Sequence, residues 1–469
     1  MLTELFADLP QTTVTSGGSD APAAGTTETL TPASSGGFPV VSAASGSQFH
    51  IADPAAASEL IAVTQTGAAW TVTRGAEGTV PVAHQAGWTA RQVVTAGVLG
   101  SMVQVVNARA FGATGDGTSD DTAALTAWIG AVNQANATFA VLPPGQYMIS
   151  GPLPPISADS VVVVGCGWSY TNFQYGSVIS ALPSYTSSSA TSGSAMLSLA
   201  GEGNRLEGVC VDGGGYAPAL ISVAGGHAQL TRIQAHHVAA DGTCVAVGPG
   251  GNSCWITDSV INGETTSGNI GLSLNDTDAI IQGCKWDNDY VCVEMLPRAG
   301  GAQIIGCHFT PGRTVGQNAI WFSGSPNDVL IASCRFDNSI GSPVQISPAG
   351  STPVNIAITN CLFQSKTLTA DTYALIAVDT TDHAVNGLSI TNNACYGGSG
   401  NLPKYFLAAQ TQTGATPANP QKIASAGCLC SGNTAWVAAS FYAADAAPTI
   451  GRGNMVTTDG SSYSAVPDI

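Results

Sequence analysis

An apolar position recurs at nearly regular intervals through the middle and C-terminal parts of the chain, separated by 24, 26, 25, 23, 27, 27 and 32 residues. Three residues later the side chain is mostly small or apolar, and five residues later it is always apolar. A fixed offset repeated over eight units predicts a solenoid in which each unit is one coil and stacked coils share a core. The recurring positions are Leu206, Leu230, Ile256, Ile281, Ile304, Ile331, Ile358 and Ile390.

Each unit also contains a second short run of alternating side chains, typical of a strand with one buried face. We therefore expect an all-β solenoid of parallel coils over residues 104–440. The repeat is lost over residues 441–469, for which we expect a C-terminal cap or a subunit contact. The second runs are Val245–Val247, Leu272–Leu274, Val291–Val293, Ile320–Phe322, Val344–Ile346 and Ile376–Val378.

A helix is predicted ahead of the repeats, at about residues 120–134. Leu125, Trp128, Ile129 and Val132 follow the spacing of one helical face, and the acidic stretch before them can cap the first turn. The preceding glycines lack the lysine of a phosphate-binding loop. This helix would cover the open end of the first coil.

The segments FGATGDGTSDDTAALTAWI and VLPPGQYMIS resemble the opening of the pectate-lyase-like superfamily, which includes phage tail-spike depolymerases. The resemblance implies a right-handed single-stranded parallel β-helix with an N-terminal capping helix. It also implies a structural role for Asp120 and Asp121, and a homotrimer. The catalytic sets of the polygalacturonase and pectate lyase branches do not transfer to this sequence.

The N-terminal region has a different texture. Residues 1–37 are rich in Thr, Ser, Gly, Ala and Pro, and we expect a flexible or assembly-ordered arm. Residues 38–103 alternate short strand-like runs with turns and predict a small β-module for attachment. The stretch WTVTRGAEGT with His84 and Gly87 resembles a module of phage tail and tail-spike proteins.

Composition narrows the functional class. Charged residues make up 9% of the chain, against about 25% in an average domain. The net charge of −17, with 13 basic residues, disfavours nucleic-acid binding, and no apolar run is long enough to insert in a membrane. The first residues lack the basic and apolar regions of a signal peptide. We expect the twelve cysteines to be mostly free, buried thiols.

Candidate chemistry lies six residues after each recurring position, where every side chain is polar. Asp287 and Asp337 fall two coils apart, roughly 9.6 Å on strand spacing, near the upper limit for an acid and base pair of an inverting glycosidase. Their column reads Asp212, His236, Asn262, Asp287, Thr310, Asp337, Gln364 and Tyr396.

The neighbouring column, four residues after the recurring position, contributes Lys285, His308 and Arg335. We assign catalytic roles to Asp287, Asp337 and His308, and substrate contacts to Lys285 and Arg335.

Glu294 and Trp321 should point outward from the second strand and offer a sugar-stacking platform beside a carboxylate. The alternative is that all these groups are solvated surface pairs. The cysteine column is predicted to be packed core rather than a metal ladder, and no metal or other cofactor is expected.

The sequence thus predicts a phage or phage-tail-like spike that binds and depolymerises a host surface polysaccharide. Its other expected partners are tail or baseplate proteins, through the N-terminal region, and it would be part of a virion or phage-tail-like particle. One alternative is a non-catalytic receptor-binding spike on the same scaffold, and another is a free-standing bacterial glycosidase.

Overall fold

The computed structural model describes residues 3–4, 10–44, 47–56, 58–95, 105–134, 138–167, 176–187, 194–264, 268–311, 318–337, 341–347, 352–365, 374–378, 385–397, 402–403, 405–408, 429–437, 440–442, 450–457 and 462–468. The chain divides into two compact units, Met1–Gln104 and Val105–Ile469. In the described residues, no helix is long and apolar enough to cross a membrane.

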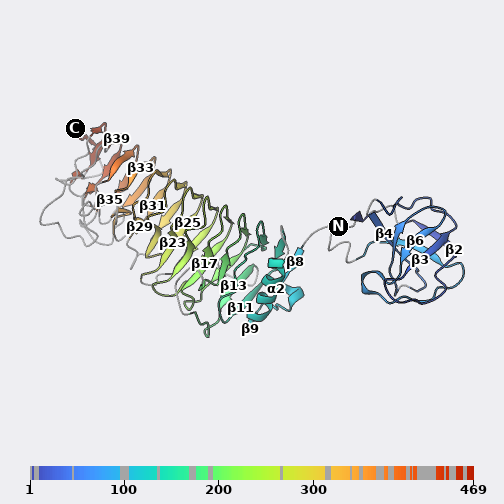
Figure 1. The fold of residues 1–469 in the computed structure, drawn as a ribbon. Coiled ribbons are helices and arrows are strands. Elements are labelled where there is room, and N and C mark those ends of the chain that lie inside the picture. Colours follow the sequence, from blue (N-terminus) through green and yellow to red (C-terminus); the bar gives the residue numbers. More distant parts are fainter. Residues whose placement is uncertain are drawn as a thin grey trace. The chain divides into compact units, whose positions relative to one another are not determined.

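The first unit is a small closed β-barrel (Figure 1). Six strands pair antiparallel in the order β4, β5, β6, β3, β2 and β7, and β7 also pairs with β4, which closes the ring and leaves no free edge among them. Strand β1 joins β4 in parallel. The elements are β1 (Thr3–Glu4), β2 (Gln11–Ser16), β3 (Thr27–Pro32), β4 (Ser47–Ala52), β5 (Ile61–Gln65), β6 (Trp70–Thr73), the 3-10 turn η1 (Ala76–Gly78) and β7 (Thr89–Val93).

The expected N-terminal arm differs from what the structure shows. Strands β2 and β3 lie within residues 1–37, and both are members of the barrel. Val14 and Leu30 are fully buried, and Thr-rich segments have a good strand propensity. The low hydrophobicity of residues 1–37 suggested an arm without a core of its own. One inward apolar side chain on each strand, Val14 and Leu30, is enough for strands that complete a small barrel.

The WTVTRGAEGT stretch contributes Trp70, Val72 and Arg74 to the interior of this barrel. Trp70 packs edge-on against Phe49 in the core. The guanidinium of Arg74 is fully buried and donates to both carboxylate oxygens of Glu59, at 2.7 and 2.9 Å, and to Glu28 at 2.6 Å. A buried charge is tolerated only when it is paired, so the ion pairs of Arg74 with Glu59 and Glu28 must form for the barrel to fold as it does.

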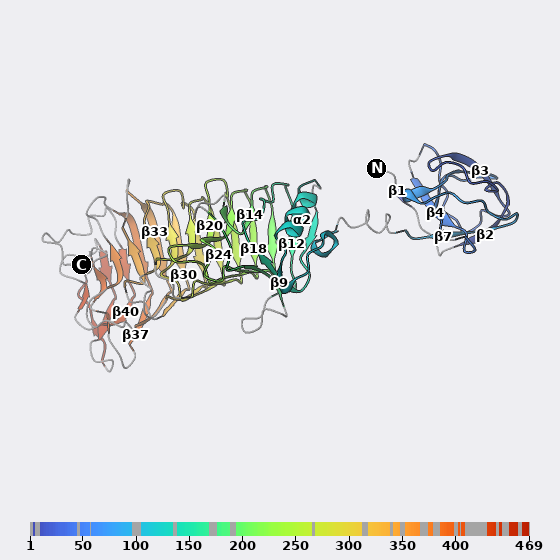
Figure 2. The ribbon, with the colours of Figure 1, turned by 90° about the horizontal axis from the view of Figure 1, so that it is seen from below.

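The second unit is a parallel β-helix, as predicted, with coils stacked along one axis (Figures 1 and 2). Each complete coil contributes a strand to each of three sheets. The first sheet contains β8 (Val105–Asn107), β10 (Phe139–Val141), β12 (Val162–Val164), β15 (Arg205–Glu207), β18 (Gln229–Thr231), β21 (Trp255–Thr257), β24 (Ile280–Gln282), β27 (Gln303–Ile305), β30 (Val329–Ala332), β33 (Val354–Thr359), β36 (Asn386–Thr391), β39 (Leu429–Ser431) and β42 (Ile450–Arg452).

The second sheet contains β9 (Asp116–Asp120), β11 (Gly145–Ile149), β13 (Ser177–Ala181), β16 (Cys210–Asp212), β19 (Gln234–His236), β22 (Val260–Asn262), β25 (Lys285–Asp287), β28 (His308–Thr310), β31 (Arg335–Asp337), β34 (Leu362–Ser365), β37 (Ala394–Gly397), β40 (Thr434–Trp436), β43 (Met455–Thr457) and β44 (Ser464–Ala465). The third contains β14 (Leu197–Leu199), β17 (Ala219–Val223), β20 (Thr243–Val247), β23 (Ile270–Leu274), β26 (Val291–Met295), β29 (Asn318–Phe322), β32 (Val344–Ile346), β35 (Ala374–Val378), β38 (Tyr405–Ala408) and β41 (Ser440–Tyr442).

The recurring apolar position forms one interior stack. Ile281, Ile304 and Ile331 pair directly across adjacent strands of the first sheet, and all are fully buried. The position five residues later forms a second stack of nearly parallel rings with centroid separations of 4.9, 5.1 and 4.7 Å. Its members are Trp286, Phe309, Phe336 and Phe363.

A tight turn between the first and second sheets keeps the coils in register. Its central residue has a left-handed backbone, as at Gly283 with φ of 65°. The amide of Gly283 donates to the carbonyl of Ile305 in the next coil, at 3.1 Å. Glycine and asparagine adopt this conformation at the lowest cost, which explains their recurrence at this step.

The predicted helix is α2 (Thr122–Gln134), and it lies at the β8 end of the coils (Figure 1), where it contacts the 3-10 turn η2 (Ala108–Phe111). All four predicted apolar side chains of its inner face are buried. Asp121 accepts hydrogen bonds from the amides of Thr114 and Gly115, and Asp120 accepts from Thr122 and Ser150. Burial raises the pKa of Asp120, but these hydrogen bonds outweigh it and leave the pKa below its ordinary value. Both aspartates thus have structural contacts.

The C-terminal segment also differs from its expectation, because the coils continue beyond residue 440. Strand β42 extends the first sheet and β43 the second. The position three residues after the recurring one becomes a ladder of buried amides in which Asn393 donates to Asn433 and Asn433 donates to Asn454, each at 3.0 Å. The repeat was hard to recognise in the sequence because the residue that follows Ile390 in the stack of recurring apolar positions is Cys430, 40 residues later.

Candidate functional site

The polar column predicted from the repeat is a continuous row on the second sheet. Asp212, His236, Asn262, Asp287 and Thr310 pair in register on adjacent strands, and Asp337, Gln364 and Tyr396 do so farther along. The residues before them point inward, because side chains alternate along a strand. The row therefore forms the outer face of the β-helix along this sheet.

Asp337 is the centre of a hydrogen-bonded group on this face. Its side chain is 9% exposed. Arg335 Nε donates to both carboxylate oxygens at 3.0 Å, and His308 Nε2 lies 2.8 Å from Oδ2. Arg335 also donates to Gln364 at 2.8 Å. With both oxygens engaged, Asp337 is suited to orienting His308 rather than to contacting a substrate itself.

His308 is the group best placed for proton transfer. Its side chain is 37% exposed, and its Nδ1 makes no hydrogen bond to any described residue. A histidine that is fixed through one ring nitrogen by a buried carboxylate presents the other to a substrate. The sequence analysis placed His308 and Asp337 in adjacent columns, and the structure joins them directly.

A second pair lies one coil before His308. Lys285 Nζ is 2.8 Å from Asp287 Oδ2, and both side chains are accessible. Lys285, His308 and Arg335 occupy the same register position on three adjacent strands. A row of basic side chains is unusual in a chain with only 13 lysines and arginines, and each of the three is paired with Asp287 or Asp337.

Glu294 and Trp321 are paired on the third sheet, apart from these groups. Both are half-buried between inward neighbours, which agrees with the expected outward alternation. Glu294 accepts hydrogen bonds from Ser323 and Ser273, at 2.8 and 3.5 Å. The indole nitrogen of Trp321 is buried without a partner in the described part of the chain. The structure thus divides the predicted site residues between two sheets.

A histidine and carboxylate group on the second sheet was not assigned a role from the sequence. His236 Nδ1 is 3.3 Å from Asp212 Oδ1, and His236 Nε2 is 2.6 Å from Glu264 Oε1. Burial lowers the pKa of His236, but the two carboxylates outweigh it and raise the pKa above its ordinary value. The column contained Asp212 and His236, so the register alone could have brought them together.

The first sheet carries a shallow groove of about 430 Å³ on its outer face. Its main aromatic side chain is Trp255, which is 47% exposed and lies next to Gln229 and Ile280 in register. An exposed indole ring beside polar side chains is a common surface for sugar stacking. Trp255 stands one residue before a recurring apolar position, where outward side chains are expected.

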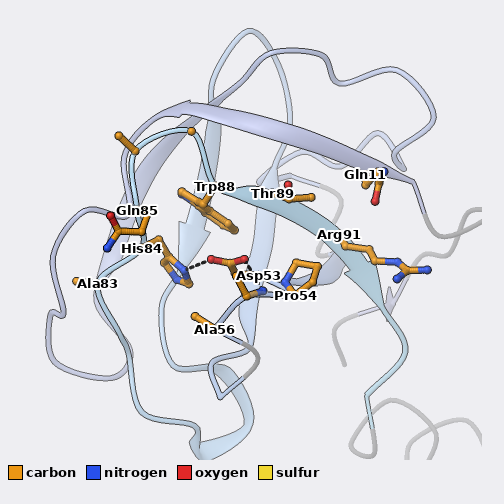
Figure 3. A pocket seen from close by; sticks show the side chains of 13 residues that line it. Gln11, Asp53, Pro54, Ala56, Ala83, His84, Gln85, Trp88, Thr89 and Arg91 are labelled. Atoms are coloured by element: carbon orange, nitrogen blue, oxygen red, sulfur yellow. Dashed lines mark hydrogen bonds and ion pairs between the residues drawn. The ribbon is translucent and has the colours of Figure 1, made fainter.

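The barrel has a larger pocket, of about 650 Å³, lined by its loops and by β2 and β7 (Figure 3). His84 stacks on Trp88 with ring centroids 4.3 Å apart, and its two nitrogens contact Asp53 and Glu59, at 2.9 and 3.2 Å. These contacts hold His84 within the pocket wall.

The cysteine column is core, as predicted. Cys284, Cys307, Cys334 and Cys361 are buried, and their thiols lie near backbone carbonyls. All eleven described cysteines are free, and only Cys166 is exposed. Burial raises the pKa of Cys210 well above its ordinary value, which makes such a thiol unreactive.

Comparison with known proteins supports the scaffold. Residues 105–310 match the family model described as rhamnogalacturonase A/epimerase, pectate lyase-like. A curated relative, the mannuronan C5-epimerase AlgE3 of Azotobacter vinelandii, is 41% identical over 70 residues, which are 14% of this chain and only 4% of that protein. The match over residues 105–310 agrees with the pectate-lyase-like resemblance of the opening segments.

Two solved structures share the fold. The A-module of the mannuronan C-5 epimerase AlgE4 from Azotobacter vinelandii is 15% identical, with a TM-score of 0.55 over 75% of this chain and 95% of that one. The catalytic unit of an alpha-1,3-glucanase from Streptomyces thermodiastaticus is also 15% identical, with a TM-score of 0.50 over 98% and 100%. The scaffold is thus one that polysaccharide-acting enzymes use.

Proposed function

We propose that this protein is a spike that binds and cleaves an acidic polysaccharide on a host cell surface. The observation that carries the proposal is the hydrogen-bonded set of His308, Asp337 and Arg335 on the outer face of the second sheet, with Lys285 and Asp287 one coil away. It combines a proton-transferring group, a carboxylate that orients it and a row of cations.

The substrate class follows from charge. The chain carries a net charge of −17, so an anionic polymer would be repelled from most of its surface. Lys285, His308 and Arg335 on neighbouring strands bring three basic side chains together, and Asp287 and Asp337 balance part of their charge. Their spacing of about 4.8 Å is close to that of successive sugars in an extended chain, and a carboxylate on each sugar could engage them in turn.

Each predicted site residue then has a role. His308 exchanges a proton with the sugar at the bond being cleaved, and Asp337 orients His308. Asp287 is the second carboxylate of the site, after Asp337. Lys285 and Arg335 bind the anionic groups, while Glu294 and Trp321 on the third sheet contact a more distant part of the polymer.

The spike assignment rests on the resemblance of the barrel stretch to phage tail modules. We propose that the barrel attaches the protein to tail or baseplate proteins of a virion or phage-tail-like particle, and that three chains associate as a homotrimer. A non-catalytic spike on the same scaffold is the second candidate, because solvent-exposed pairs such as Lys285 with Asp287 also suit simple adhesion.

The test is an incubation of the full chain with a panel of acidic and neutral surface polysaccharides. New reducing ends without unsaturation indicate hydrolysis, in which water is added across the bond. An unsaturated product indicates elimination, in which a proton is removed and a double bond forms. Binding without either product supports the adhesive spike and contradicts the proposed enzyme.

Variants connect the activity to the site. His308→Gln should lower the cleavage rate by about 10²–10⁴-fold, because it removes the proton-transferring group. Asp337→Asn should lower kcat more than it weakens binding, since it disturbs the contact that orients His308 and also removes the charged partner of Arg335. Arg232→Gln is the control, because Arg232 is an exposed, ion-paired cation beside Glu207 on the first sheet. Equal activity of His308→Gln and Arg232→Gln would contradict the assignment.

A further inference from the structure

We propose that Asp212, His236 and His237 form a binding site for one divalent transition-metal ion of the zinc type. Each residue offers one ligand atom, and these atoms all lie within 4.8 Å of one another. The site lies on the same sheet as the proposed catalytic groups but on earlier coils, and the proposed glycan cleavage does not use it.

The β-helix register brings these residues together. Asp212 ends β16 and His236 ends β19, and the two residues are direct partners on adjacent parallel strands. His237 follows at once and has a left-handed backbone with φ of 52°. Because successive side chains of a regular strand point to opposite faces, this turn is what allows two consecutive histidines to contribute to one site.

The separation between Asp212 and His236 is long for a charge-assisted hydrogen bond and matches the distance between two ligands of one zinc ion. Asp212 Oδ1 lies 3.3 Å from His236 Nδ1, whereas charge-assisted hydrogen bonds are about 2.7–2.9 Å long. Two ligand atoms about 2.0–2.1 Å from a tetrahedral zinc ion are about 3.3–3.4 Å apart.

Groups that orient the ligands are already in place. Glu264 Oε1 lies 2.6 Å from His236 Nε2, the ring nitrogen that would not bind the metal. A carboxylate at this position fixes the ring and strengthens the imidazole as a ligand. The amide of Gly214 donates to Asp212 Oδ1 at 3.0 Å, which fixes the carboxylate. A side chain at Gly215 would begin 3.1 Å from His237 Nε2, so glycine leaves room for that ring.

The ligand types favour zinc over calcium or magnesium. Imidazole nitrogen suits zinc and similar ions, whereas calcium and magnesium prefer sites built from oxygen. Three protein ligands leave a fourth position open, as in sites where the metal binds water or an anion.

The experiment is a calorimetric titration of the chelator-treated full chain with Zn²⁺ and, separately, with Ca²⁺. It uses a Cys166→Ser background, because the exposed thiol of Cys166 is a competing ligand. We expect one Zn²⁺ per chain and no Ca²⁺. His237→Ala should abolish zinc binding, and Glu264→Gln should weaken it by about 10–100-fold.

His227→Ala is the matched control, because His227 is an exposed histidine beside a carboxylate, Glu202, outside the site. It should bind zinc like the parent. Asp212→Asn, of nearly the same shape, replaces His237→Ala if that variant does not fold. No zinc binding by the parent, or full binding by both Asp212→Asn and His237→Ala, would overturn the proposal and leave His236 as a histidine bracketed by carboxylates.

Discussion

At the scale of single residues, the titration of one buried carboxyl, that of Asp289, leads to a prediction. Asp289 is fully buried, with Oδ1 accepting from Asn269 at 3.0 Å and Oδ2 without a partner among the described residues. Burial raises the pKa of Asp289 well above its ordinary value. Its carboxyl is therefore neutral in the folded chain under conditions where an unfolded chain would ionise it.

This difference predicts a pH-dependent gain from Asp289→Asn. Below the ordinary aspartate pKa both states hold the proton, and the folded chain pays no penalty. As pH rises above that value, only the unfolded state ionises, so the parent loses stability that the neutral amide retains. The stabilising effect of Asp289→Asn on Tm, by a few degrees or about 1 kcal/mol, should grow from pH 4 to pH 8. An effect of the same size at both pH values would refute a buried neutral carboxyl.

The residue scale also shows the limit of sequence reasoning about the site. The columns containing Lys285, His308 and Asp337 were readable because they stand at fixed offsets from the repeat. The hydrogen bond between His308 and Asp337 could not be predicted from the sequence, because it depends on side-chain conformations in neighbouring coils. The role of His237 was hidden for a further reason, since its left-handed backbone breaks the alternation on which columns rely.

At the scale of elements, the strands were predictable where apolar side chains repeat. The left-handed turn between the first and second sheets keeps adjacent coils in register. The stacked rings of Trp286, Phe309, Phe336 and Phe363 show that this register is maintained over four coils. Strands β2 and β3 were missed because their inward positions include only a few bulky side chains. The coils after residue 440 were missed because a long interval precedes them and asparagine replaces the apolar residue at one inward position.

The aromatic stack should be a major source of stability. Phe336 is almost fully buried, with rings of Phe309 and Phe363 stacked on its two faces. Phe336→Ala should destabilise the β-helix by about 3–5 kcal/mol, since it removes buried surface and leaves a cavity. Denaturant unfolding measures the change. Tyr396→Ala, at an exposed ring of the outer row, should alter stability by only about 0.5 kcal/mol, and a similar loss from both variants would argue against the stack.

At the scale of the whole molecule, the chain has two separate hydrophobic cores, one in the barrel and one in the β-helix. Separate cores predict separate unfolding transitions in calorimetry. Glu59→Gln should lower one transition by an amount equivalent to about 1.5–3 kcal/mol, because it removes one of the two carboxylates that pair with the buried Arg74 guanidinium and leaves only Glu28. The second transition should not move, and a single transition that shifts as a whole would contradict independent units.

The proposed trimer belongs to this scale as well. Sedimentation equilibrium of the full chain should give three times the chain mass of 47.1 kDa, and a monomer would remove the spike assignment while leaving the glycan site testable. A closed cyclic trimer is a reasonable expectation, because most soluble homo-oligomers have closed symmetry.

Ile390 and Cys430 are neighbours in one stack although 40 residues separate them, whereas most other steps need about 25. The stacking of the β-helix strands is thus maintained although the number of residues between successive strands differs from coil to coil. We expect insertions between strands to leave the stacked core and the outward rows of the second sheet in place. On the proposed function, such insertions would change the surface offered to a glycan while the β-helix keeps its register.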